Sequence, residues 1–114
     1  GKTAKLQCDL AALISSEHFN RFVKPGLSML ARKLDNTIYH LDGPQALHQT
    51  DILCSIEELN AVQFTPLNKN RDGLHKDWFE PLYDKLSAAG KSMAITAYGG
   101  IDDWIRGIDT LLSR

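Results

Sequence analysis

A histidine and an aspartate, His40 and Asp42, stand two positions apart in the segment YHLDGP (39–44). The overlapping stretch TIYHL (37–41) is rich in β-branched and aromatic side chains, which is typical of a β-strand. Because side chains alternate along a strand, His40 and Asp42 should share one of its faces. An imidazole can exchange a proton or bind a metal near neutral pH, and a carboxylate can orient it. The pair is therefore the first candidate for catalytic residues.

The same pair also has a purely structural interpretation. Gly43 and Pro44 follow Asp42 at once, and proline is well suited to the first turn of a helix. Asp42 could then cap that helix by accepting from its free N–H groups, while His40 bonds to a neighbouring carbonyl. The residues alone leave both interpretations open.

Short apolar segments alternate with longer amphipathic ones along the whole chain. The spacing predicts strands at 4–8, 37–41, 61–64 and 92–98. It predicts helices after Ser15 and Ser16 (with a kink or a break at Pro25 and Gly26), at 45–56, from Asp77 to Gly90, and over the closing segment 99–114. The polar segment 67–76 is predicted to be an exposed, mobile loop.

Four successive strand–helix units predict an α/β fold with a parallel sheet and right-handed crossovers. A chain of 114 residues has room for a single domain, 1–114. Two architectures fit: a small open sheet, or half of a TIM-type (βα)8 barrel, whose full size is about 250 residues. An open half would leave strand edges and one apolar sheet face bare. We therefore expect a half barrel that is completed by forming a homodimer.

The carboxyl ends of parallel strands form the active face in folds of this kind. Polar side chains of other strands should therefore meet His40 and Asp42 there. The candidates for substrate binding are Asp9, Gln63, Thr65 and Tyr98. Cys8 could join His40 and Asp42 as a metal ligand, although a lone cysteine is also typical of a buried small hydrophobe.

Charge and composition argue against several classes of function. The 13 basic and 14 acidic residues are spread along the chain, so no basic face for nucleic acid is evident. The apolar runs are shorter than the roughly 20 residues that span a membrane. The two cysteines are too few for a disulfide framework. We expect a soluble, cytoplasmic protein with reduced thiols that binds neither nucleic acid nor membrane.

Four segments resemble, in their order and spacing, the carboxy-terminal half of the uroporphyrinogen decarboxylase superfamily, which also contains cobalamin-dependent methyltransferases. The segments are LQCDLAALIS, YHLDGPQAL, LNAVQFTP and PLYDKLSAAGKS, and YHLDGP with QFTP is the most specific part. The resemblance runs from about Ala4 to about Ser92. It implies a (βα)8 barrel with its site at the carboxyl ends of the strands, and an enzyme of the lyase or methyltransferase type.

The chain departs from both branches of that superfamily. In the methyltransferases a His-x-Cys-Gly strand supplies two zinc ligands and a later cysteine a third, whereas here Asp42 replaces the thiolate and no cysteine follows Cys54. A carboxylate can bind zinc, but it activates a thiol less strongly. The decarboxylases also use residues of an amino-terminal half that has no counterpart in this sequence, and a glycine-rich turn that LNKNRDG (67–73) replaces.

Two functions remain in play from the sequence. The first is an enzyme in which the rim around His40 and Asp42 binds a small carboxylated or methylated molecule, with zinc or another divalent metal as its candidate cofactor. The second is a non-catalytic barrel fragment that acts as an oligomerisation or interaction module. Tightly bound metal in stoichiometric amount would favour the first.

Overall fold

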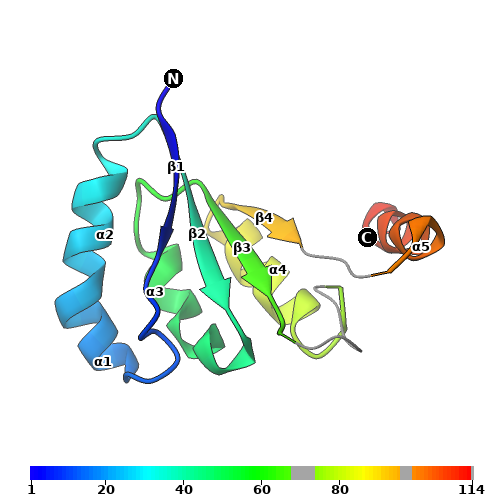
Figure 1. The fold of residues 1–114 in the computed structure, drawn as a ribbon, viewed down its shortest axis with the longest axis horizontal. Coiled ribbons are helices and arrows are strands. Elements are labelled where there is room, and N and C mark those ends of the chain that lie inside the picture. Colours follow the sequence, from blue (N-terminus) through cyan, green and yellow to red (C-terminus); the bar gives the residue numbers. More distant parts are fainter. Residues whose placement is uncertain (68–73, 96–98, 114) are drawn as a thin grey trace.

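A computed structural model describes residues 1–67, 74–95 and 99–113 of the chain. Its sheet has four parallel strands in the order β1-β2-β3-β4, so each strand lies beside the next one in the sequence (Figure 1). The strands are β1 (Thr3–Gln7), β2 (Asn36–Asp42), β3 (Ala61–Thr65) and β4 (Ser92–Ile95). The predicted α/β fold with a parallel sheet is therefore confirmed, and the sequential order is compatible with a half barrel.

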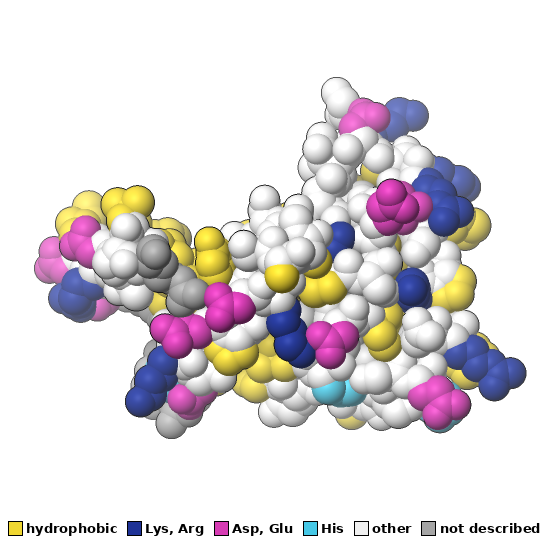
Figure 2. All heavy atoms as spheres, turned by 180° about the vertical axis from the view of Figure 1, so that it is seen from behind, with side chains coloured by type: hydrophobic (Ala, Val, Ile, Leu, Met, Phe, Trp, Pro, Cys, Tyr) yellow, Lys and Arg dark blue, Asp and Glu magenta, His cyan; other side chains and the backbone are white. Residues whose placement is uncertain are grey.

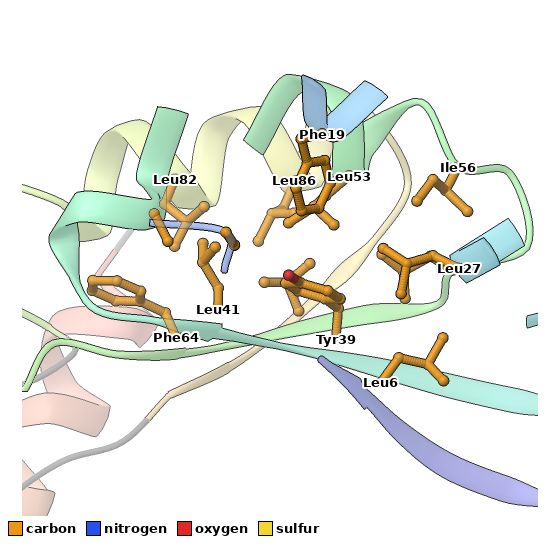
Figure 3. Close-up of a cluster of buried hydrophobic side chains, with 14 of the residues drawn as sticks. Leu6, Phe19, Leu27, Tyr39, Leu41, Leu53, Ile56, Phe64, Leu82 and Leu86 are labelled. Carbon is orange, nitrogen blue, oxygen red and sulfur yellow. The ribbon is translucent and has the colours of Figure 1, made fainter. Parts of the chain in front are cut away.

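The helices that connect the strands all lie on one face of the sheet (Figures 1 and 3). The connections are, in order, α1 (Ser16–His18) with a π-helical segment (Phe19–Val23) and α2 (Lys24–Ala31), a 3-10 helix (Pro44–Gln49) with α3 (Thr50–Cys54), and α4 (Phe79–Ala88). The last helix, α5 (Ile101–Leu112), stands apart beyond β4 (Figure 1). Within the described ranges, none of these helices has the length and apolar character needed to cross a membrane.

Three helices differ in detail from the sequence prediction. The turns just before Pro25 are π-helical, because a proline has no N–H to continue the regular α-helical ladder. The second helix begins with 3-10 turns rather than α-helical ones. The third begins at Phe79 with Trp78 as its N-cap, instead of at Asp77. Most of the loop predicted to be mobile, residues 68–73, lies outside the described residues.

The hydrophobic core fills the space between the sheet and the helix layer (Figure 3). Tyr39 and Leu41 of β2 are almost completely buried and point toward the helices, where the ring of Phe19 meets that of Tyr39 edge-on at 6.4 Å. Tyr39 and Leu41 thus share the helix-covered face, in keeping with the alternation of side chains along a strand. The same alternation leaves His40 and Asp42 on the opposite face.

A buried lysine connects β4 to the end of α3. Lys91 is only 8% exposed, and its Nζ donates to the carbonyl oxygens of Ile56 and Leu59 at 2.6 and 2.7 Å. Burial lowers the pKa of Lys91. Its ammonium group thus satisfies carbonyls that lie beyond the last hydrogen-bonded turn of α3.

No helix covers the other face of the sheet in the part of the chain that the structure describes (Figure 1). The strand register and the alternation of side chains place these residues on that face: Lys5, Gln7, Ile38, His40, Asp42, Ala61, Gln63, Thr65, Ser92 and Ala94. The face is therefore mostly polar, where the sequence analysis predicts an apolar one. Parallel sheets are usually covered on both faces, so a polar face without a cover is unusual.

Candidate functional site

The register of the sheet aligns polar side chains across three strands at their carboxyl ends. His40 of β2 lies opposite Gln7 of β1 and Gln63 of β3, and Asp42 lies opposite Thr65. We call this set, together with Asp9 just after β1, the carboxyl-end row. The row contains five of the residues expected at the site: His40, Asp42, Gln63, Thr65 and Asp9.

His40 is held by a neighbouring side chain. Its Nδ1 lies 3.2 Å from Oε1 of Gln63, which makes Nδ1 the donor to the amide oxygen. Its Nε2 lies 3.8 Å from Oδ1 of Asp42, too far for a hydrogen bond but close enough for electrostatic attraction whenever the imidazole is protonated. The His40 side chain is 19% exposed and that of Asp42 is 56% exposed. Nε2 and the carboxylate are thus both available to a ligand.

The turn after Asp42 depends on glycine. Gly43 has a φ of 83°, and an added Cβ would lie 2.9 Å from Oε1 of Gln45. The N–H of Gly43 donates to the carbonyl oxygen of Thr65 at 2.8 Å, which fixes the end of β2 against the end of β3. This conformation favours glycine and explains why it stands between the aspartate and Pro44.

Neither half of the structural interpretation of the pair is found in the described residues. Gly43, not Asp42, is the N-cap of the 3-10 helix, and no side-chain hydrogen bond caps that helix. His40 bonds to the side chain of Gln63 rather than to a backbone carbonyl.

The end of β1 contributes a second carboxylate to the site. Nε2 of Gln7 donates to Oδ1 of Asp9 at 2.9 Å. Asp9 and Asp42 both line an open hollow of about 470 Å³, whose other lining residues are Cys8, Ala11, Ala12, Leu13, Gln45 and Leu67. Gln7 is a site residue that the sequence reasoning missed. One signal in the sequence could have identified it: Gln7 stands two residues before Asp9, so the alternation of side chains along a strand places the two residues on the same face.

The wall of this hollow is anchored to the 3-10 helix. Gln49 is fully buried, and its Nε2 donates to the carbonyl oxygens of Ala11 and Ile14 at 3.0 and 2.9 Å. The two ring nitrogens of His48 lie 2.8 and 2.9 Å from the carbonyl oxygens of Gln45 and Ile14. The loop after β1 is therefore fixed by side chains that the sequence analysis did not assign to the site.

The described structure does not support Cys8 as a metal ligand beside His40 and Asp42. It packs against the hydrophobic core with part of its surface and lines the hollow with the rest. Among the described residues, no three His, Cys, Asp or Glu side chains are grouped so that they could hold a metal ion. Tyr98, the remaining residue expected at the site, lies outside the described residues.

The hollow is acidic. Asp9 and Asp42 are charged, and no basic side chain is among its described lining residues. The carboxylates of Asp9 and Asp42 are hydrogen-bond acceptors, and so is the Nε2 of His40 when Nδ1 donates to Gln63. Such a surface suits a molecule that donates hydrogen bonds or carries positive charge.

Comparison with known proteins adds no relative: no family model, no curated protein and no solved structure matches this chain.

Proposed function

We propose that the chain is a ligand-binding half barrel of the uroporphyrinogen decarboxylase-like type, whose carboxyl-end row holds a small molecule. The observation that carries this proposal is the arrangement of His40. Gln63 of the neighbouring strand fixes its Nδ1, and its Nε2 is left facing Asp42 on a sheet face without a helix. A histidine with a purely structural role would not require an exposed carboxylate beside it, such as that of Asp42, or a position on the uncovered face of the sheet.

The charges of the site determine the class of ligand. Asp9 and Asp42 would repel a carboxylate, so the carboxylated substrates that the resemblance implies fit less well than amines, amino alcohols or polyols. His40 and Asp42 supply only two ligands to a zinc ion, which needs three or four from the protein. We therefore place an organic molecule with amino or hydroxyl groups at the site.

The proposed chemistry is proton exchange. His40 has one nitrogen fixed by Gln63 and the other near Asp42, a residue that lines the hollow. An imidazole so oriented can accept a proton from a bound hydroxyl or amino group while the carboxylate stabilises the resulting charge. The alternative is a non-catalytic module, in which the same residues bind a ligand without changing it.

The half barrel itself is part of the proposal. Three features support it: the sequential strand order, the placement of the connecting helices on one face, and the two free edges at β1 and β4. In a barrel the face without helices becomes the interior, where polar residues at the carboxyl ends form the site. A second copy of the chain would supply the missing strands.

The test is a titration of the isotope-labelled protein with ethanolamine, myo-inositol, succinate and zinc chloride, each alone, followed by backbone amide NMR. We expect ethanolamine or myo-inositol to shift the signals of residues 7–9, 40–43 and 63–65 in a saturable way, with a dissociation constant on the order of 1 mM. Succinate should leave these signals unchanged.

Three variants make the titration specific. His40→Ala and Asp42→Asn should weaken binding at least about tenfold while the remaining spectrum is retained. His18→Ala, which removes an exposed histidine from α1, is the matched control and should bind as the unaltered protein does. Equal shifts in His40→Ala, or no saturable shift with any of these compounds, would contradict the proposed site.

A further inference from the structure

Two exposed apolar patches lie at opposite ends of the molecule. The β1-side patch consists of Phe22, Met29 and Leu30, on the helical run that follows β1. The β4-side patch consists of Ile101, Ile105, Ile108 and Leu112, on the helix that follows β4. Figure 2 shows hydrophobic side chains gathered on the projecting lobe that α5 forms. Each patch thus belongs to the helix of an edge strand.

The β4-side patch is too exposed to be an ordinary surface feature. Ile101 is 77% exposed and Leu112 is 81% exposed, although they stand on the apolar side of an amphipathic helix. The inner side of α5 approaches Leu74 and Ile95 through Trp104, Gly107 and Leu111. Ile108, which is 50% exposed, lies between this inner side and the open patch. An amphipathic helix with an open apolar side of this kind marks a contact with another surface.

The two patches carry opposite charge. On α5, Asp103 is paired with Arg106, which leaves Asp102 and Asp109 without an ion-pair partner among the described residues. Both flank Ile105 on the helix surface, at three and four residues from it.

The surroundings of the β1-side patch are basic. Arg21 lies over the ring of Phe22, with its guanidinium carbon 5.1 Å from the ring centroid. Lys33 is exposed in the turn that follows α2, four residues after Met29. Apolar side chains with basic neighbours at one end thus complement apolar side chains with acidic neighbours at the other.

We propose that α5 of one copy packs on the β1-side patch of a second copy, and we call this contact the seam. The inference rests on the proposed half barrel, because β4 of one copy must meet β1 of the other when two halves close. The helix after β4 then lies beside the helix after β1 of the second copy. Two-fold symmetry produces the same seam twice, so the β1-side patch and the β4-side patch of both copies are covered.

Two variants test the seam from its two sides. Ile105→Lys with Asp109→Lys alters only the β4-side patch, and Phe22→Glu with Lys33→Glu alters only the β1-side patch. Light scattering at micromolar concentration should give twice the monomer mass for the unaltered chain and the monomer mass for each double variant. Far-ultraviolet circular dichroism should be unchanged, and the milder Ile105→Ala should weaken dimerisation about tenfold without reversing any charge.

Mixing the two double variants is the decisive step. A mixed dimer has one seam in which neither surface is altered and one in which both charges are reversed. We therefore expect the mixture to regain the dimer mass, although each variant alone is monomeric. Contact between the two α5 helices, in contrast, would leave the β1-side variant dimeric and the mixture without recovery.

The outcomes separate the seam from the proposed function. A monomeric unaltered chain would overturn both the two-copy barrel and the seam, and a dimer that persists in either variant would overturn the seam alone. Glu57→Lys, an acid-to-lysine change at an exposed position outside both patches, should stay dimeric. If His40→Ala loses ligand binding but remains a dimer, the result supports the ligand site at the carboxyl-end row and does not test the seam.

Discussion

Tyr39 and His40 are adjacent in the chain but serve opposite faces of the sheet. Tyr39 is 1% exposed beneath the helices, and among the described residues its hydroxyl has no well-formed hydrogen bond, although the backbone of Cys8 lies near it. His40 faces away from the helices and has Gln63 and Asp42 as neighbours. A shift of β2 by one residue would therefore bury the imidazole and expose the phenol ring.

The hydroxyl of Tyr39 should cost stability rather than add it. A buried polar group without a partner costs roughly 1–3 kcal/mol. We expect Tyr39→Phe to raise the free energy of unfolding by about 1 kcal/mol at neutral pH, as measured by urea denaturation. Tyr39→Leu, which also loses the ring contact with Phe19, should instead lower it.

The same residue predicts how stability depends on alkaline pH. Burial raises the pKa of Tyr39. Above the ordinary tyrosine pKa of about 10, the unfolded chain loses a proton that the folded chain retains. The free energy of unfolding should therefore decrease as the pH rises above about 10, and Tyr39→Phe should decrease less steeply than the unaltered protein. Parallel slopes for the two proteins would contradict this origin of the pH dependence.

At the scale of the elements, Lys91 holds the end of α3 and the start of β4 together. Lys91→Met keeps most of the side-chain volume but removes the donor to the carbonyl oxygens of Ile56 and Leu59, of which only that of Ile56 keeps another donor within the described ranges, the N–H of Leu59. We expect a loss of about 1–3 kcal/mol in urea denaturation. The same substitution at Lys85, whose partner Asp51 is exposed with it at the surface, is the control and should change stability little. Equal losses at the two positions would contradict the proposed role of Lys91.

The strands were the elements easiest to predict, because a half-buried strand imposes an alternation that the sequence displays. TIYHL (37–41) indicates the strand that the structure extends to Asn36–Asp42. The alternation of its side chains predicts two sets of residues, one for the buried face and one for the open face, and the structure shows this pattern. The π-helical turns before Pro25 and the 3-10 turns after Gly43 were not predicted. These helix types differ from an α-helix only in the register of the backbone hydrogen bonds, which the apolar spacing does not specify.

The candidate site was predictable only strand by strand. Alternation places His40 and Asp42 on one face, but the pairing of His40 with Gln63 depends on the register between two strands 23 residues apart. Gln7 was missed for the same reason. Its position beside His40 depends on the register between β1 and β2, which the residues next to Gln7 in the sequence do not reveal. The anchoring of the loop by Gln49 depends on contacts between still more distant segments.

At the scale of the whole molecule, three unusual features have one common explanation. Within residues 1–67, 74–95 and 99–113, the parallel sheet has a polar face without helices, both of its edges are free, and the helix at each edge exposes an apolar patch. A second copy would cover the face, pair the edges and bury the patches together. The carboxyl-end row would then lie in the mouth of a closed barrel rather than on an open sheet.

In the proposed site, His40 binds the ligand through its Nε2 while Gln63 holds its Nδ1. Nitrogen-15 NMR of the histidine side chains, recorded during a titration with ethanolamine at a pH of about 8.5, well above the ordinary histidine pKa, tests this directly. We expect the Nε2 signal of His40 to shift in a saturable way, and the signals of His18 to stay constant. Binding that leaves both ring nitrogens of His40 unshifted would contradict the account.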